Sequence, residues 1–383
     1  MIIDVPGQMR ISLILILLFL CAGRCCFAAE PLLVLRSTQV EMTWAPAGGA
    51  LIAFQFRDDK INPLNFEIPP PLPTRQAEVP LLRGHFLCLD RWGAPSAAEQ
   101  SHGMPYHGEA AAVRWTTVSE PQPSNRQVSA EMSCELPLAG LRVARHILLD
   151  DTGSVALITE QVTNGNKLGR IYNIVQHPTI APPFLNDDTL VDSNARAGFL
   201  QDGPVPSSRD AASRWPTIAV RSAEVDLRQL RSEPGDVSDV SSFVFDNDEA
   251  YGWVTASSPR QKLLLGYVWK SADYPWLNIW RFRVDGKPAA RGLEFGTTGY
   301  HQPFPTLVKQ GRLLDRPTFA HLDADETIGR AYLCFLGRIP ADFQGVAELR
   351  VAEGKLRLKE RRQADPRVIE LTTGLGLSGV LGR

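Results

Sequence analysis

Three side chains of this sequence are suited to acid–base chemistry: His107, His177 and Glu294. An imidazole has an ordinary pKa of about 6.5, so either histidine can hold or release a proton near neutral pH. Glu294 stands between Leu293 and Phe295 on a predicted strand. Partial desolvation there would raise the pKa of its carboxyl group towards the range of a useful base. Together these groups could move protons on and off a hydroxyl group.

Each of the three residues also has a purely structural interpretation. His107 precedes Gly108, and a lone histidine in such a loop is often only exposed to solvent. His177 follows a strand at 171–176 and opens a proline-rich loop, where a backbone carbonyl could satisfy its ring. Glu294 could be an outward charge on an alternating strand. The sequence leaves both interpretations open.

Three further residues could bind a polar ligand. Arg91 offers a planar fork of donors that suits neighbouring hydroxyl groups or an anionic substituent. Tyr274 and Trp280 belong to an aromatic-rich segment, and a tryptophan can offer an apolar face to a ring-shaped ligand. Strand tryptophans are more often part of the core, so a structural role is the alternative for Trp280.

Common catalytic signatures are absent from the sequence. It contains no G-x-S-x-G, H-E-x-x-H or G-x-x-x-x-G-K motif, and no cysteines paired at zinc spacing. A catalytic site must therefore be assembled from residues that are far apart in the chain.

The elements that would position these residues are predicted to be antiparallel strands. The clearest pattern is at 128–136, where Val128, Ala130, Met132 and Cys134 alternate with polar residues. Short turn sequences join this segment to strands at 141–149 and 155–162. Further strands are predicted at 51–56, 171–176, 243–245, 262–269, 277–284, 331–336, 346–351 and 355–359. The best helical patterns are short, at 222–230 and 323–332. This density of strands predicts an all-β fold, a large antiparallel β-sandwich.

The segments between the strands suggest one large domain. Residues 68–80 are rich in proline and 202–214 are polar, which predicts surface loops. Residues 355–362 are strongly basic, but their charges alternate with leucines, so we interpret them as a solvated edge strand. We predict a domain over 30–365 and a C-terminal tail at 366–383.

The composition excludes one class of partner. The chain is 44% hydrophobic and 21% charged, and 40 basic residues against 42 acidic ones give a net charge of −2. Such a balance creates no field that would gather a polyanion, so we expect no nucleic-acid partner.

The N-terminus predicts export. Residues 11–22 are apolar, follow Arg10 and precede the small residues Ala28 and Ala29. This run is too short to cross a bilayer as a helix, which needs about 20 residues. We interpret residues 1–29 as a signal peptide and expect a periplasmic or extracellular protein without a stable transmembrane segment. Beyond the signal peptide the chain has the cysteines Cys88, Cys134 and Cys334. They are either buried free thiols, or two of them form a disulfide.

Three segments resemble, in the same order, the sugar-handling sites of the galactose mutarotase (aldose 1-epimerase) superfamily. They are His107-Gly108-Glu109 with Trp115, His177-Pro178 with Pro183-Phe184, and Tyr274-Pro275 through Glu294. The resemblance spans roughly residues 40–305 as short motifs. It departs from the family at Thr179, where an aromatic residue usually follows His-Pro.

The resemblance implies a mutarotase-like supersandwich that binds a carbohydrate and interconverts its anomers. Glu294 would accept the proton of the anomeric hydroxyl, and His177 would protonate the ring oxygen. The residues implied to orient or contact the sugar are His107, Arg91, Trp280 and Tyr274. No metal or organic cofactor is implied. Two alternatives stay open: a carbohydrate-binding protein without turnover on the same fold, and a structural or assembly protein of the cell envelope.

Overall fold

The structure is a computed structural model that describes residues 31–68, 81–220, 223–229, 236–352 and 354–376. The predicted signal peptide and most of the predicted loop at 68–80 lie outside the described residues. The described residues from Pro31 onward form one compact unit. None of the helices in the described part of the chain has the length and hydropathy needed to span a bilayer.

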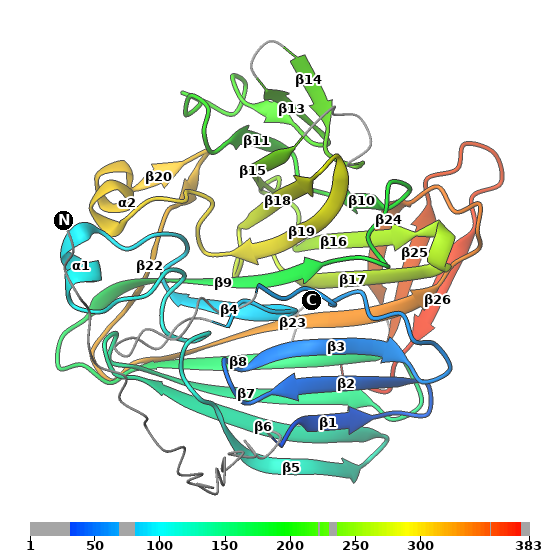
Figure 1. Cartoon of the computed structure of the whole chain (residues 1–383), viewed down its shortest axis with the longest axis horizontal. Helices are drawn as coiled ribbons and strands as arrows, with labels where there is room; N and C mark the ends of the chain where they lie inside the picture. The colour runs from blue at the N-terminus through cyan, green and yellow to red at the C-terminus, as the bar shows by residue number, and fades with distance from the viewer. Residues whose placement is uncertain (1–30, 69–80, 221–222, 230–235, 353, 377–383) are drawn as a thin grey trace, which may run out of the picture. The chain divides into compact units, whose positions relative to one another are not determined.

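Two large antiparallel sheets make up most of the described chain (Figure 1). The larger has eleven strands in the order β1 (Leu33–Arg36), β2 (Val40–Ala45), β3 (Ala50–Phe56), β4 (His85–Asp90), β9 (Arg170–Ile180), β19 (Lys287–Gly296), β18 (Trp276–Val284), β15 (Val237–Val244), β11 (Ala197–Leu200) and β12 (Ser213–Arg214), with β22 (Ala320–Leu322) paired to β9. The smaller has eight strands in the order β10 (Leu190–Ser193), β16 (Tyr251–Ser258), β17 (Leu263–Lys270), β23 (Thr327–Arg338), β8 (Val155–Asn164), β7 (Leu141–Asp150), β6 (Gln127–Leu136) and β5 (Thr116–Ser124).

The remaining elements are short. They are the hairpins β13 (Thr217–Val220) with β14 (Ala223–Asp226) and β20 (Arg312–Leu313) with β21 (Arg316–Pro317), the sheet of β24 (Val346–Ala352), β25 (Lys355–Glu360) and β26 (Val368–Thr372), the helices α1 (Ala97–Ser101) and α2 (Phe304–Gln310), and the single-turn helix Pro259–Gln261.

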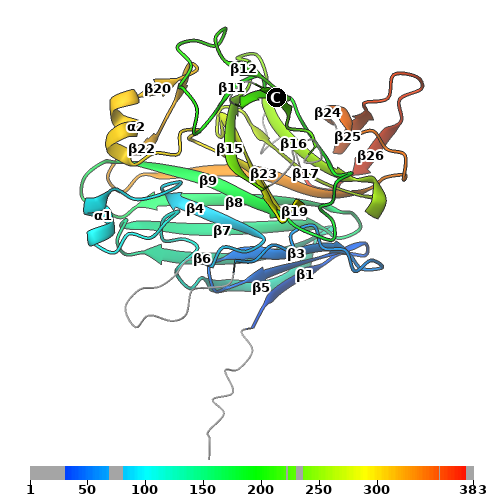
Figure 2. The same ribbon diagram turned by 45° about the horizontal axis from the view of Figure 1, so that its top comes forward.

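The two large sheets pack face to face around one hydrophobic core. Figure 2 shows strands of the larger sheet, such as β3 and β4, lying against strands of the smaller sheet, such as β7 and β8. On β6 the predicted inward row of Val128, Ala130, Met132 and Cys134 is buried in this core. Alternation with period two thus directs one face of each strand to the core. The predicted all-β antiparallel sandwich is confirmed.

Both predicted helices are wrong. Residues 223–226 form strand β14, and residues 327–332 begin strand β23. The short apolar patterns at 222–230 and 323–332 fit a helical period and a period of two almost equally well, and pairing within the sheets decides for strand. The helices of the described chain lie elsewhere. Helix α1 begins at a capping box in which Ser96 and Glu99 bond each other's backbone N–H groups.

The C-terminal sheet corrects two further predictions. Strand β25 lies between β24 and β26, so it is a central strand and not an edge. Its leucines, Leu356 and Leu358, are buried, whereas Arg357 forms an ion pair of 2.7 Å with Glu370 on β26. The predicted tail begins at residue 366, yet β26 pairs with β25 along its whole length. The sheet therefore continues past the predicted domain end.

The three cysteines Cys88, Cys134 and Cys334 are free and buried. Of the two alternatives left open by the sequence, the buried thiols are the ones present. Burial also raises the pKa of the Cys88 thiol, so it stays protonated at neutral pH.

Candidate functional site

One row of side chains crosses the larger sheet on the face that points away from the core. Phe86 on β4 pairs directly with His177 on β9. The register that joins Gly292 to Thr179 and Phe295 to Gln176 places Glu294 of β19 opposite His177 on the other side. Because neighbours along a strand point to opposite faces, Leu293 and Phe295 enter the core while Glu294 faces outward.

This outer face is hollowed into a cavity of about 220 Å³. Strands β4, β9, β15, β18 and β19 form its floor, and loops before β4 and after β4 and β19 form its walls. The described residues that line it are Phe66, Ile68, Leu82, Phe86, Trp92, Tyr106, His107, His177, Ser238, Val240, Trp280, Glu294 and His301. His107, His177 and Glu294, which lie far apart in the sequence, therefore meet in one place.

Glu294 is held between two partners at the bottom of the cavity. Its Oε2 accepts a hydrogen bond of 2.6 Å from Trp92 Nε1, and its Oε1 lies 3.2 Å from His177 Nε2. Burial raises the pKa of Glu294 to about 8, although the Trp92 bond acts in the opposite direction. The carboxyl group is therefore mostly protonated at pH 7.

His177 supplies the matching acceptor. Its Nδ1 lies 3.0 Å from Thr179 Oγ1, whose hydroxyl donates to the carbonyl of His177 at 3.5 Å. That arrangement places the ring proton on Nδ1 and leaves a lone pair on Nε2, facing Glu294. Burial lowers the pKa of His177 to about 3, so the ring is neutral at pH 7. We therefore describe the contact as a neutral pair sharing one proton, because burial disfavours the charged form of both groups.

His107 is fixed by its backbone. It has a φ of 66° and is followed by Gly108 with a φ of 80°, a left-handed turn. A Cβ at position 108 would collide with the carbonyl oxygen of Leu89, so glycine is needed for this close approach. His107 Nδ1 accepts a 3.0 Å hydrogen bond from the backbone N–H of Gly93, which assigns the ring proton to Nε2. Burial lowers the pKa of His107 well below its usual range, so it is a neutral donor.

The lining includes residues that sequence reasoning did not select. Trp92 binds Glu294, and Phe86 stacks on His177 with ring centroids 4.1 Å apart. Tyr106 Oη and His301 Nε2 lie 3.3 Å apart. Two of them had a weak signal in the sequence, since Tyr106 precedes His107 and Trp92 follows Arg91. His301 had no signal beyond its position shortly after the strand of Glu294.

Trp280 lines the cavity and packs beside His177, with ring centroids 6.4 Å apart. Its ring stacks on Phe282 at 5.4 Å and meets Phe66 edge to face at 5.7 Å. One apolar side of the cavity is thus built on Trp280, where a sugar ring could lie.

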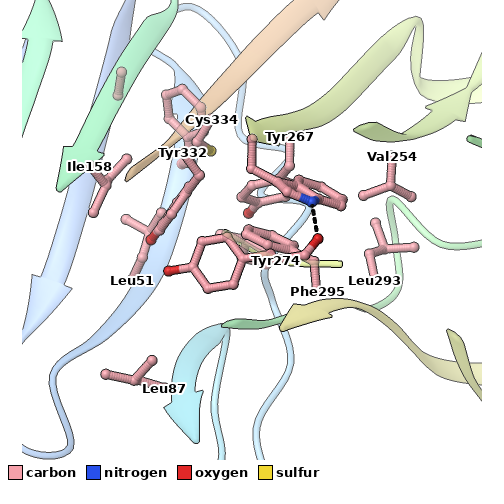
Figure 3. Packing of buried hydrophobic residues seen from close by; sticks show 14 of the residues in the cluster. Leu51, Leu87, Ile158, Val254, Tyr267, Tyr274, Leu293, Phe295, Tyr332 and Cys334 are labelled. Carbon is pink, nitrogen blue, oxygen red and sulfur yellow. Dashed lines mark hydrogen bonds between the residues drawn. The ribbon is translucent and has the colours of Figure 1, made fainter. Parts of the chain in front are cut away.

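Arg91 and Tyr274 are not among the residues that line the cavity. The guanidinium of Arg91 forms ion pairs of 2.6 Å with Asp90 and 2.7 Å with Glu99. Tyr274 is fully buried in the core between the sheets, beside Phe295 at 5.3 Å, as Figure 3 shows. Neither side chain is placed to contact a ligand in the cavity, which corrects the two sequence-based assignments.

Comparison with solved structures identifies this fold elsewhere. A candidate aldose 1-epimerase of Klebsiella pneumoniae subsp. pneumoniae superposes with a TM-score of 0.57 at 14% identity, covering 79% of this chain and 78% of that one. A galactose mutarotase related enzyme of Lactobacillus acidophilus gives 0.55 at 11% identity, with 81% and 98% covered. A galactose mutarotase-like protein of Clostridium acetobutylicum gives 0.54 at 12%, with 80% and 95% covered.

No protein-family model and no curated protein matches the sequence. The identities to the solved structures are low, so the likeness concerns the fold and not the activity. At that level it agrees with the resemblance seen in the three sequence segments. The chain has the galactose mutarotase-like fold.

Proposed function

We propose that this protein binds an aldose and interconverts its anomers by acid–base opening and closing of the ring. The observation that carries the proposal is the contact of 3.2 Å between Glu294 Oε1 and His177 Nε2 inside a cavity lined by aromatic rings. Two titratable groups whose environments push their pKa values in opposite directions are typical of an acid–base couple.

The neutral pair holds one transferable proton, which is what the reaction requires. Glu294 would donate this proton to the ring oxygen while His177 Nε2 accepts the proton of the anomeric hydroxyl. The bond between C1 and the ring oxygen then breaks as the C1 carbonyl forms. Rotation about C1–C2 and reversal of both transfers give the other anomer.

The family resemblance implies the opposite roles, with Glu294 as base and His177 as acid. The two assignments use the same two residues. They differ in which residue holds the shared proton at the start and in which sugar oxygen faces each residue. Burial favours the neutral form, in which the proton starts on Glu294. His107 would donate from Nε2 to a sugar oxygen, and Trp280 would pack against the ring.

The second candidate is a carbohydrate-binding protein without turnover. It is favoured by the neutral, aromatic lining, which suits binding and does not by itself require catalysis. Both candidates predict that the protein binds a sugar in this cavity, and turnover separates them.

The wild-type protein should therefore accelerate mutarotation of at least one aldose above the spontaneous rate. The measurement is polarimetry, or saturation-transfer NMR, on a panel of freshly dissolved aldoses and their phosphates with the buffer rate subtracted. Binding without acceleration would select the second candidate. If no sugar on the panel binds or reacts, both candidates fail.

The pH dependence of kcat/KM should follow the protonation of the Glu294–His177 pair. The pair carries one transferable proton between the pKa values of His177, about 3, and Glu294, about 8. We expect kcat/KM to fall as pH rises through about 8, because Glu294 then loses the proton and no acid remains. Trp92→Phe removes the bond that lowers the pKa of Glu294, so it should move this limb to higher pH by about one unit.

Trp253→Phe is the matched control, since Trp253 belongs to a separate hydrophobic cluster formed by β16 and its neighbours. Its pH profile should match that of the wild type. An alkaline limb that stays in place or moves down in Trp92→Phe would disprove the role given to this bond.

A further inference from the structure

A second polar group, outside the acid–base pair, lies in the same cavity. Tyr106 Oη and His301 Nε2 are 3.3 Å apart, and both side chains line the cavity. The His301 ring also meets Trp92 edge to face, with centroids 4.5 Å apart. Because Trp92 binds Glu294, this group is joined to the pair through a single residue.

The position of His301 is built into the fold. Its backbone N–H donates to Gln201 Oε1 at 3.0 Å, and Gln201 Nε2 donates to Ser242 Oγ at 2.6 Å and to the carbonyl of Gly299 at 2.7 Å. Gly93 has a φ of 93°, and a Cβ there would lie 2.5 Å from His301 Nε2. A glycine is thus required where the ring of His301 approaches the backbone.

The ring contacts give the order of side chains along the cavity. His301 lies 5.9 Å from His107, and His107 lies 5.3 Å from His177, measured between ring centroids. Trp280 also contacts His177, with ring centroids 6.4 Å apart. A ligand that contacts the Glu294–His177 pair and packs on Trp280 therefore also lies near Tyr106 and His301, which can bind another of its polar groups.

The charge state of this end indicates which groups it can recognise. Burial lowers the pKa of His301 to about 4, against an opposing effect of Asp202, and raises that of Tyr106 to about 12. The other titratable side chains near the two residues are His107, His177, Glu294 and the protonated thiol of Cys88, which are neutral at pH 7, and Asp202, which adds no positive charge. A neutral hydroxyl group can both donate to and accept from such a pair, whereas an anionic substituent gains no opposite charge here.

We propose that Tyr106 and His301 together bind a neutral hydroxyl group of the sugar and so position its ring against Glu294 and His177. This inference rests on the proposed function, and it assigns a task to two residues that are not part of the proton transfer. They are positioning residues that select which aldose is held correctly, and they leave the acid–base steps to the pair.

The test compares Tyr106→Phe and His301→Asn with the wild type. Tyr106→Phe loses the hydroxyl group, and His301→Asn loses the group at the position of Nε2, because the shorter amide reaches only as far as Nδ1. KM and the Kd for the sugar should therefore rise roughly 5- to 100-fold while kcat changes little. The alkaline limb of the pH profile should stay where it is in the wild type. Tyr300→Phe is the control, because Tyr300 is the neighbour of His301 but packs on Phe199 at 6.2 Å, outside the cavity. It should leave KM unchanged.

Deoxy analogues of the best aldose, each lacking one hydroxyl, sharpen the test. One analogue should bind the wild type more weakly by a similar factor, and Tyr106→Phe should add little further loss for that analogue. Additive losses for every analogue would overturn the inference, as would unchanged KM and Kd in both variants. A shifted alkaline limb would also overturn it, because that result assigns the residues to proton transfer.

Two outcomes separate this inference from the proposed function. A wild type that turns over a sugar while the variants behave like the wild type defeats the inference alone. A wild type that binds no sugar defeats the proposed function and the inference with it. Tyr106→Phe removes a single oxygen from a side chain that is 44% exposed, so it decides the question even if His301→Asn does not fold.

Discussion

Glu294→Gln should lower the rate of anomer interconversion by about 10²- to 10⁴-fold without unfolding the protein. The amide keeps the shape of the side chain, and its oxygen can still accept the hydrogen bond from Trp92 Nε1. What it loses is the proton shared with His177. The sugar affinity should therefore persist, and polarimetry with an independent binding assay distinguishes the two effects. His177→Gln should show a loss of the same order, because it removes the other half of the couple.

Glu131→Gln is the matched control, because Glu131 lies on β6 of the other sheet and its side chain is 28% exposed. It should leave the rate unchanged. A Glu294→Gln protein that is as active as an active wild type would refute the catalytic assignment, although the fold would stand.

The same variant has an expected effect on stability whose sign follows from its pKa. The folded-state pKa of Glu294 is about 8, raised from 4.5, so between these values the folded protein holds a proton that the unfolded chain has lost. Stability contributed by this site is therefore present below about pH 4.5 and is lost as pH rises towards 8. Glu294→Gln has no such loss, so its melting temperature relative to wild type should be higher at pH 8 than at pH 5.

The sequence predicted best which face of a strand each side chain points to. Leu293, Glu294 and Phe295 were enough to place a carboxylate opposite two core residues, because the period of a strand is two. Which strands become neighbours is a property of pairing between distant segments, and no local pattern records it. Only the family resemblance predicted that His177 and Glu294 lie close together. The register between β9 and β19 is the physical reason that they do.

Arg91 and Tyr274 were predicted to contact the ligand, and the two predictions fail for different reasons. Arg91 has the right chemistry for hydroxyl groups, but the buried carboxylate of Asp90 next to it competes for the guanidinium. Tyr274 lies between the turn at 271–273 and β18, outside any strand, so the rule of alternation does not apply to it, and its ring enters the core. The type of a residue shows which groups its side chain can bind. It does not show which of those groups lies nearest to it in the folded protein.

Directly beneath the site, a buried polar network connects the two sheets. Arg145 on β7 binds Glu160 Oε1 on β8 with Nε at 2.8 Å, and its guanidinium lies between the rings of Trp44 and Trp115 at 4.8 and 4.2 Å. Glu160 Oε2 accepts a 2.6 Å bond from Gln176 Nε2 on β9. Trp115, part of the first family-like segment, therefore supports this network and does not line the cavity.

The network explains how the acid–base pair is held in register. Gln176 Oε1 is 3.1 Å from His85 Nε2 on β4, so the bonds continue across the two strands that carry Phe86 and His177 on the opposite face. Gln176 and His85 are the immediate sequence neighbours of the cavity residues His177 and Phe86, and Glu160 and Arg145 extend the network from Gln176 into the smaller sheet. Breaking this network should therefore lower the free energy of unfolding of the protein.

Arg145→Met should lower the free energy of unfolding by about 3–5 kcal/mol. The methionine fills much of the same volume between the two tryptophans, so the loss comes mainly from Glu160, which would be left buried without its cation. Arg145 is 2% exposed and Glu160 is fully buried, so water cannot replace the missing partner. Equilibrium urea unfolding, compared at equal m-values, measures the difference.

The double variant Arg145→Met with Glu160→Gln separates charge from packing. The glutamine carbonyl can still accept from Gln176, while the uncompensated charge is gone, so a large part of the lost stability should return. Arg36→Met is the surface control, because the Arg36–Glu41 pair has side chains 57% and 28% exposed and should contribute less than about 1 kcal/mol. If the double variant is as unstable as Arg145→Met alone, the cost lies in the packing of the arginine between Trp44 and Trp115, and the buried charge is not what the network must neutralise.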